Sequence, residues 1–161
     1  MPFQGTTDAS GLRIAVVVSR FNDFVTDRLL AGAREALASA GAPSDAVDVV
    51  SVPGAYEVPQ AARAAASTGA YDAVVCLGCL IRGETPHFEY IAEAAAHGIM
   101  SASAETGVPM SFGVLTTNSA EQAMERAAPG SANKGWEAAM AAVEMATLRR
   151  ALRAGPGGVT P

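Results

Sequence analysis

The sequence predicts an α/β fold in which a mostly parallel sheet of four strands lies between two layers of helices, a three-layer α/β/α sandwich. Short apolar segments alternate along the chain with segments of helical period, a pattern typical of parallel sheets. The apolar segments are nearly continuous, as in strands that are buried on both faces. With 161 residues, the chain is long enough for one such domain and a substantial core.

The first two strands are predicted over residues 12–19 and 48–52. The first is a nearly unbroken apolar run, and the second is closed by a Pro-Gly pair. Between them, residues 26–40 predict a helix because apolar residues recur there with a period of 3.6. Gly41 follows directly and is a favourable residue for ending a helix.

An alanine-rich helix over residues 59–68 should connect the second strand to a third over residues 73–77. The next helix should open at Thr85-Pro86, with threonine as the cap and proline at the first helical position. Its pattern continues to about residue 98 or further. Each of these connections is expected to be right-handed.

The fourth strand is predicted over residues 110–115. Ser119 should cap a short helix that ends near Ala127, and a last helix should run from Lys134 to about Leu152. We predict an N-terminal arm over residues 1–11, a single domain over 12–153 and a flexible tail over 154–161. The tail is rich in glycine and proline.

Composition excludes several classes of function. No apolar run approaches the ~20 residues that a membrane span needs, and the net charge of −5 argues against a broad nucleic-acid surface. The N-terminal residues lack the pattern of a signal peptide, so a cytoplasmic location is expected. Half of the residues are apolar, many of them alanine, which favours extensive contacts between copies of the chain.

The two cysteines, Cys76 and Cys79, form a CxxC pair. A zinc site needs about two more ligands at similar spacing, and the sequence offers none. Redox-active CxxC pairs lie at a helix N-terminus, whereas this pair lies on a strand and its exit. We therefore interpret the cysteines as buried structural residues, and no metal site is expected.

Unusual polar and aromatic residues follow each of the first three strands. They are Arg20 to Asn22, Gly54 to Glu57 and Gly78 to His87. In parallel sheets, ligands bind beyond the carboxyl ends of the strands. Three separate loops should therefore meet at one rim of the sheet and form a binding site.

Two aromatic residues and one acid at this rim have alternative interpretations. Phe21 is either a hydrophobic staple for the next helix or a platform for a flat heterocycle. Glu57 is either a solvated surface acid or a partner for ligand hydroxyls and amines. Tyr56 is better explained by packing than by chemistry.

The segment before the third helix has features of an anion site. Gly83, Glu84 and Thr85 precede a helix start, where free amides favour phosphate, although ordinary capping by Thr85 also explains them. His87 falls in the first turn, where the helix dipole favours a neutral imidazole that can accept a proton. A lone histidine at a helix start can also be incidental.

Other candidates lie elsewhere in the chain. Arg82, Arg126 and Lys134 are possible anion contacts, although isolated basic residues are usually solvated. Lys134 is the only lysine, so an enzyme that used its own lysine as an imine-forming amine would depend on it. Phe112 lies within the fourth strand, where core packing is the default interpretation.

Six segments of the sequence form a recognisable set: SRFNDFVT, VPGAYEVP, LGCLIRGETPHFEY, PMSFGVLTTN, the Glu125-Arg126 pair and NKG. Together they resemble the 6,7-dimethyl-8-ribityllumazine synthase family. They occur in the family's order and spacing from about Leu12 to Leu152. The resemblance implies a flavodoxin-like fold and a transferase of riboflavin biosynthesis.

The resemblance also implies two substrates, 5-amino-6-(D-ribitylamino)uracil and 3,4-dihydroxy-2-butanone 4-phosphate. His87 would transfer protons, and Glu84 and Thr85 would hold the phosphorylated ketone. The residues implied to contact the uracil and its ribityl chain are Phe21, Asn22, Ala55, Tyr56, Glu57, Cys79, Leu80 and Ile81. Phe112 would close over the uracil and Arg126 would bind the phosphate, both from an adjacent subunit.

The same resemblance implies a homo-oligomer and no cofactor. We expect a pentamer, with a decamer or a sixty-subunit shell left open, and no metal or organic cofactor. The imine forms between the two substrates, which agrees with the scarcity of lysine. The alternatives are a flavodoxin-like binding module without chemistry, a shell protein with a degenerate site, and an archaeal-type riboflavin synthase that uses lumazine itself.

Overall fold

The computed structural model describes residues 2–157 of the chain, which form one four-stranded parallel sheet in the order β2-β1-β3-β4. The strands are β1 (Ile14–Ser19), β2 (Val47–Val52), β3 (Ala73–Ile81) and β4 (Met110–Thr117). Strand β1 pairs with β2 on one side and with β3 on the other, so that Val16 lies opposite both Val49 and Val75. The chain therefore reverses its winding direction between β1 and β3, where α/β folds bind ligands.

Residues 2–157 also form five α-helices and two short 3-10 helices, and the last two α-helices follow the last strand. The α-helices are α1 (Asp23–Ser39), α2 (Val58–Ser67), α3 (His87–Thr106), α4 (Ala120–Arg126) and α5 (Lys134–Ala154). The 3-10 helices are η1 (Ser44–Ala46) and η2 (Ala55–Glu57). None of the helices described over residues 2–157 is both long and apolar enough to cross a membrane.

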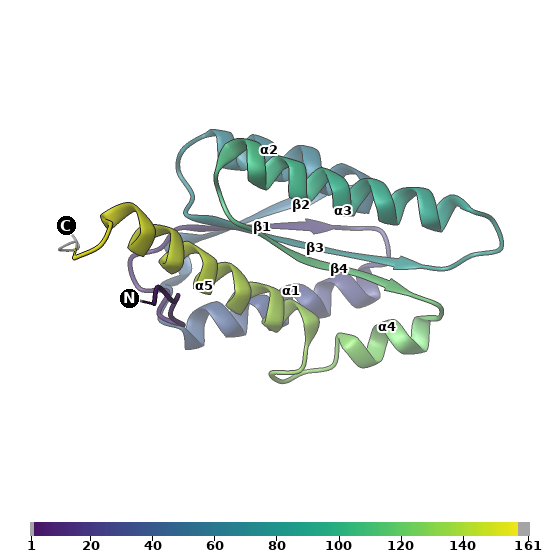
Figure 1. Cartoon of the computed structure of the whole chain (residues 1–161). Coiled ribbons are helices and arrows are strands. Elements are labelled where there is room, and N and C mark those ends of the chain that lie inside the picture. The colour runs from purple at the N-terminus through teal and green to yellow at the C-terminus, as the bar shows by residue number, and fades with distance from the viewer. Residues whose placement is uncertain (1, 158–161) are drawn as a thin grey trace.

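The helices cover both faces of the sheet, with α2 and α3 on one face and α1, α4 and α5 on the other (Figure 1). Alternate residues of β1 supply the two cores: Ile14 and Val16 pack with α1 and α5, whereas Ala15 and Val17 pack with α2. This confirms the predicted three-layer α/β/α sandwich of flavodoxin-like type.

The first helix starts earlier than predicted, directly after the loop that follows β1. Helix α1 begins at Asp23, three residues earlier than expected, because Asn22 adopts a left-handed conformation with φ 64°. The Asn22 carbonyl then accepts hydrogen bonds from the amides of Val25 and Thr26. A non-glycine residue in this region is uncommon and is tolerated best by asparagine.

Strand β3 is longer than the sequence predicts and continues through Gly78 to Ile81. Its extra residues pair with β4, and Ile81 lies opposite Thr117. Pairing between distant segments thus extends a strand into a region whose local sequence favours a loop.

The start of α3 also differs from the prediction. Pro86 occupies the cap position and the helix begins at His87. Thr85 makes no capping hydrogen bond, so its interpretation as a helix cap is wrong. The predicted cap Ser119 is confirmed, because its hydroxyl accepts a hydrogen bond from the Gln122 backbone amide.

Helices α1 and α5 approach closely at a buried asparagine that joins three segments. The Asn133 amide nitrogen donates to the carbonyls of Arg28 (3.2 Å) and Ala127 (2.9 Å). Its side-chain oxygen accepts from the amides of Gly135 (2.8 Å) and Trp136 (3.1 Å), which caps α5. One side chain therefore fixes the turn between α4 and α5 against α1.

The ends of the described chain lie away from the carboxyl rim of the sheet (Figure 1). In the N-terminal arm, the Thr6 amide donates to the Thr147 hydroxyl of α5 at 2.8 Å. Helix α5 continues to Ala154, two residues beyond its predicted end. Of the predicted tail, residues 158–161 lie outside the described residues, and the domain boundaries stay a prediction.

Candidate functional site

A cavity of about 690 Å³ lies at the carboxyl rim of the sheet, where the loops after β1, β2 and β3 meet. Its lining comprises Phe21, Asn22, Pro53, Gly54, Ala55, Tyr56, Glu57, Leu80, Ile81, Gly83, Thr85, His87, Phe88, Tyr90 and Ile91. We call it the rim cavity. Its size falls within the range of ordinary small-molecule sites.

Backbone and side-chain hydrogen bonds hold the three loops together. The Phe21 amide donates to the Pro53 carbonyl at 3.0 Å, which ties the first loop to the second. The Asn22 side-chain amide donates to the Cys79 carbonyl at 2.9 Å, which ties the first loop to the end of β3. The left-handed backbone of Asn22 therefore places its side chain across the switch point of the sheet.

Aromatic side chains form much of the wall of the rim cavity and remain open to solvent. Phe21 is 69% exposed, Tyr56 65% and Tyr90 72%. A staple packed under a helix would be covered, so the exposure of Phe21 favours its interpretation as a platform for a flat ring. The exposure of Tyr56 contradicts the expectation that it serves mainly in packing.

The polar groups of the rim cavity come from two helix starts. Glu57 is partly buried in η2, directly before α2, and His87 is the first residue of α3. The free amides at the start of α3 lie beside Gly83 and Thr85, which also line the cavity. An imidazole, a carboxylate and free amides around aromatic walls can bind a polar heterocycle and move protons.

Nine of the predicted site residues therefore share one cavity. They are Phe21, Asn22, Ala55, Tyr56, Glu57, Leu80, Ile81, Thr85 and His87. Two others lie just outside it. Glu84 is exposed in the same loop but does not line the cavity. Cys79 lies on β3 with its side chain in the core under α1, so only its backbone faces this region.

The two cysteines project to opposite faces of the sheet. Cys76 is buried in the core under α2 and α3, and Cys79 in the core under α1 and α5. Both are free thiols, and burial raises the pKa of Cys76 to about 12 and that of Cys79 to about 11. These findings agree with a structural role. Within residues 2–157, His, Cys, Asp and Glu side chains form no group of three suited to a metal ion.

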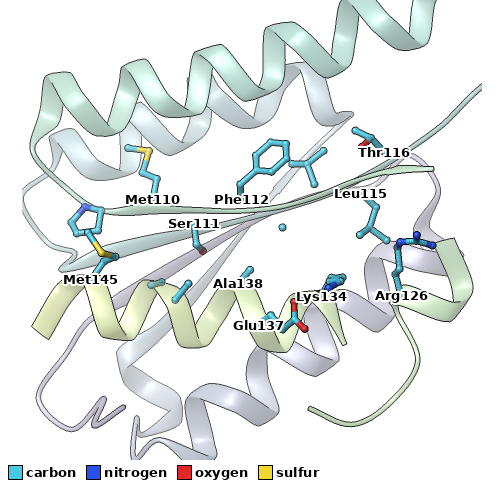
Figure 2. Close-up of a pocket in the computed structure, with 15 residues that line it drawn as sticks. Met110, Ser111, Phe112, Leu115, Thr116, Arg126, Lys134, Glu137, Ala138 and Met145 are labelled. Atoms are coloured by element: carbon cyan, nitrogen blue, oxygen red, sulfur yellow. Dashed lines mark hydrogen bonds and ion pairs between the residues drawn. The ribbon is translucent and has the colours of Figure 1, made fainter. Parts of the chain in front are cut away.

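Phe112 and Arg126 lie in a second cavity, of about 480 Å³, along the edge strand β4 (Figure 2). Phe112 is 49% exposed, so core packing does not explain it. Figure 2 shows Arg126 at the end of α4, with Lys134 and Glu137 at the start of α5. The Lys134 ammonium forms an ion pair with Glu137 at 2.9 Å. We call this the edge cavity.

Sequence reasoning missed four residues that line the rim cavity, Pro53, Phe88, Tyr90 and Ile91. A helix that begins at His87 places residues 90 and 91 on the same face one turn later. That spacing was the available signal. Arg82 was a candidate anion contact, but it does not line the cavity, and its guanidinium is engaged by neighbouring side chains.

Two comparisons with known proteins indicate the same family. A model of the family described as 6,7-dimethyl-8-ribityllumazine synthase matches residues 11–150. A curated protein from Desulfatibacillum aliphaticivorans, named 6,7-dimethyl-8-ribityllumazine synthase, is 50% identical over 145 residues. That match covers 90% of this chain and 94% of the relative.

Proposed function

The chain belongs to the 6,7-dimethyl-8-ribityllumazine synthase family, which makes it an enzyme of riboflavin biosynthesis; from that premise we propose how its side chains divide the work. The substrates are 5-amino-6-(D-ribitylamino)uracil and 3,4-dihydroxy-2-butanone 4-phosphate. The observation that carries this proposal is the convergence of Phe21, Glu57 and His87 on one cavity.

The uracil substrate occupies the inner part of the rim cavity. Phe21 stacks on the pyrimidinedione ring, and its exposed face supports this role. The backbone of Cys79, Leu80 and Ile81 borders the ring edge. The ribityl chain runs along the second loop, past Asn22, Ala55, Tyr56 and Glu57.

The phosphorylated ketone lies at the loop before α3, near Glu84 and Thr85. Its ketone carbon then faces the 5-amino group of the uracil, close to His87. Amine attack on the ketone forms an imine and releases water, phosphate leaves by elimination, and ring closure releases a second water. His87 moves protons between these steps, and the protein supplies no amine of its own.

A complete site requires two copies of the chain. The rim cavity has no arginine or lysine in its lining, whereas the edge cavity carries Arg126 and Lys134. We propose that the edge cavity of one copy closes over the rim cavity of the next, so that Arg126 holds the phosphate and Phe112 covers the uracil. Head-to-tail contacts of this kind generate rings, here a pentamer. The enzyme works in the cytoplasm without metal or organic cofactor.

The test is an absorbance assay with both substrates. Appearance of lumazine and release of phosphate are the expected results. Binding of a product analogue without turnover would instead identify a binding module. Formation of riboflavin from lumazine alone would identify a riboflavin synthase and contradict the proposal.

A further inference from the structure

Arg82 connects three segments around the start of α3. Its amide donates to the Thr117 carbonyl at 2.8 Å, which continues the pairing of β3 with β4 by one residue. Its Nε donates to the side-chain oxygen of Asn118 at 3.0 Å. A terminal nitrogen of the same guanidinium forms an ion pair with Glu89 in the first turn of α3.

The Arg82 guanidinium also lies over an aromatic ring of the rim cavity. Its central carbon is 4.7 Å from the centroid of Phe88, within the range of a cation–π contact. Phe88 and Glu89 directly follow His87. Arg82 therefore contacts the two residues that directly follow His87, the proposed proton-transfer residue.

The far end of this connection is itself fixed. The Asn118 amide donates to the side-chain oxygen of Gln122 at 2.9 Å, and the Gln122 amide donates to the Ser119 hydroxyl at 3.1 Å. The end of β4 and the first turn of α4 thus form a firm anchor for Arg82.

The helix start that Arg82 contacts has little other support within the chain. Pro86 cannot cap α3 with its side chain, and no capping hydrogen bond is present. Among residues 2–157, the side chains of Glu84 and Thr85 make no hydrogen bond that would fix the loop. The planar fork of arginine is suited to holding an acceptor on each side, and lysine is not.

We propose that Arg82 is a positioning residue, which fixes the first turn of α3 so that the His87 imidazole faces the reacting substrates. This inference rests on the proposed function. The Arg82 and Glu89 side chains are about half exposed, with 49% and 47% accessible, so their ion pair adds little to global stability. The effect of Arg82 should therefore appear in turnover more than in folding.

The test compares Arg82→Ala in two backgrounds. In the otherwise native chain, we expect kcat to fall by about tenfold, because small misplacement of a reacting group is costly. In the His87→Ala background, the same change should lower kcat by less than about twofold, because the residue being positioned is gone. Arg82→Lys should recover only part of the loss.

Two further variants keep the result interpretable. Asn118→Ala removes one acceptor while keeping the arginine, and we expect a smaller loss of kcat with the same dependence on His87. Arg63→Ala breaks another exposed ion pair, which Arg63 of α2 forms with Glu105 of α3. This change should leave kcat unchanged. Melting temperature and native mass are measured for every variant.

Equal losses of kcat from Arg82→Ala in both backgrounds would overturn the proposal, as would an unchanged kcat in the native background. An Arg82→Ala protein that does not assemble, together with an Asn118→Ala protein of native activity, would also overturn it. If the unaltered chain made no lumazine from the two substrates, the proposed function would fail instead, which is a separate outcome.

Discussion

Mixing two impaired variants should restore activity if each site is shared between neighbouring copies. The structure places His87 in the rim cavity and Arg126 in the edge cavity of the same chain. In an oligomer of His87→Ala chains every site lacks the imidazole, and in one of Arg126→Ala chains every site lacks the guanidinium. A mixed oligomer contains some contacts at which both groups are native.

The expected recovery follows from the ring geometry. In the proposed ring, each head-to-tail contact combines the rim cavity of one copy with the edge cavity of the next. With equal mixing, half of the first copies carry native His87 and half of the second carry native Arg126, so about one quarter of the sites are complete. We expect kcat/KM to rise to about 25% of the native value, from about 1–10% for the His87→Ala protein alone.

The assay is lumazine formation at low concentrations of the phosphorylated ketone, after the two variants are unfolded together and refolded. The matched control mixes His87→Ala with Phe21→Ala. Both of these side chains line the same rim cavity, so no mixed contact is complete and no recovery is expected. If native mass spectrometry finds mixed oligomers whose activity only equals the mean of the two variants, the shared site is wrong.

Three further predictions concern single residues. Arg126→Ala should raise the KM for the phosphorylated ketone by about 10–100-fold with a smaller change for the uracil, as steady-state kinetics with each substrate would show; equal changes in both would contradict the phosphate assignment. Asn133→Ala should lower the free energy of unfolding by about 2–4 kcal/mol in urea titrations, because it leaves buried groups of α1 and α5 without partners; a loss within the ~0.5 kcal/mol typical of surface changes would refute this. The free energy of unfolding should fall above pH 9.0, because the thiols of Cys76 and Cys79 ionise from that pH when unfolded but only near 12 and 11 when folded. Each thiol contributes a slope of about 1.4 kcal/mol per pH unit, and a Cys76→Ala/Cys79→Ala protein with an unchanged slope would contradict the assignment.

The sequence predicts the layers and the location of the site because these depend on local patterns. Continuous apolar runs mark buried strands, and helical periodicity marks the connections. The polar loops after β1, β2 and β3 then reach one rim through the geometry of a parallel sheet alone. Phe21, Glu57 and His87 could be placed together for this reason.

Details that depend on tertiary contacts could not be read from the sequence. The last four residues of β3 form a strand only because β4 pairs with them. The early start of α1 depends on the left-handed backbone of Asn22, and that residue's side chain bonds to the Cys79 carbonyl across the sheet. Thr85 was expected to cap α3, yet the helix begins two residues later.

His87 and Arg126 lie in different cavities of the chain, and this has a consequence for inhibitors. In the proposed assembly, a molecule that fills the rim cavity of one copy and reaches Arg126 of the next contacts two chains at once. Its binding therefore also favours the association of the two chains. Such a compound should bind more weakly as the protein is diluted, and should raise the thermal stability of the assembly. A compound confined to the rim cavity should show neither dependence.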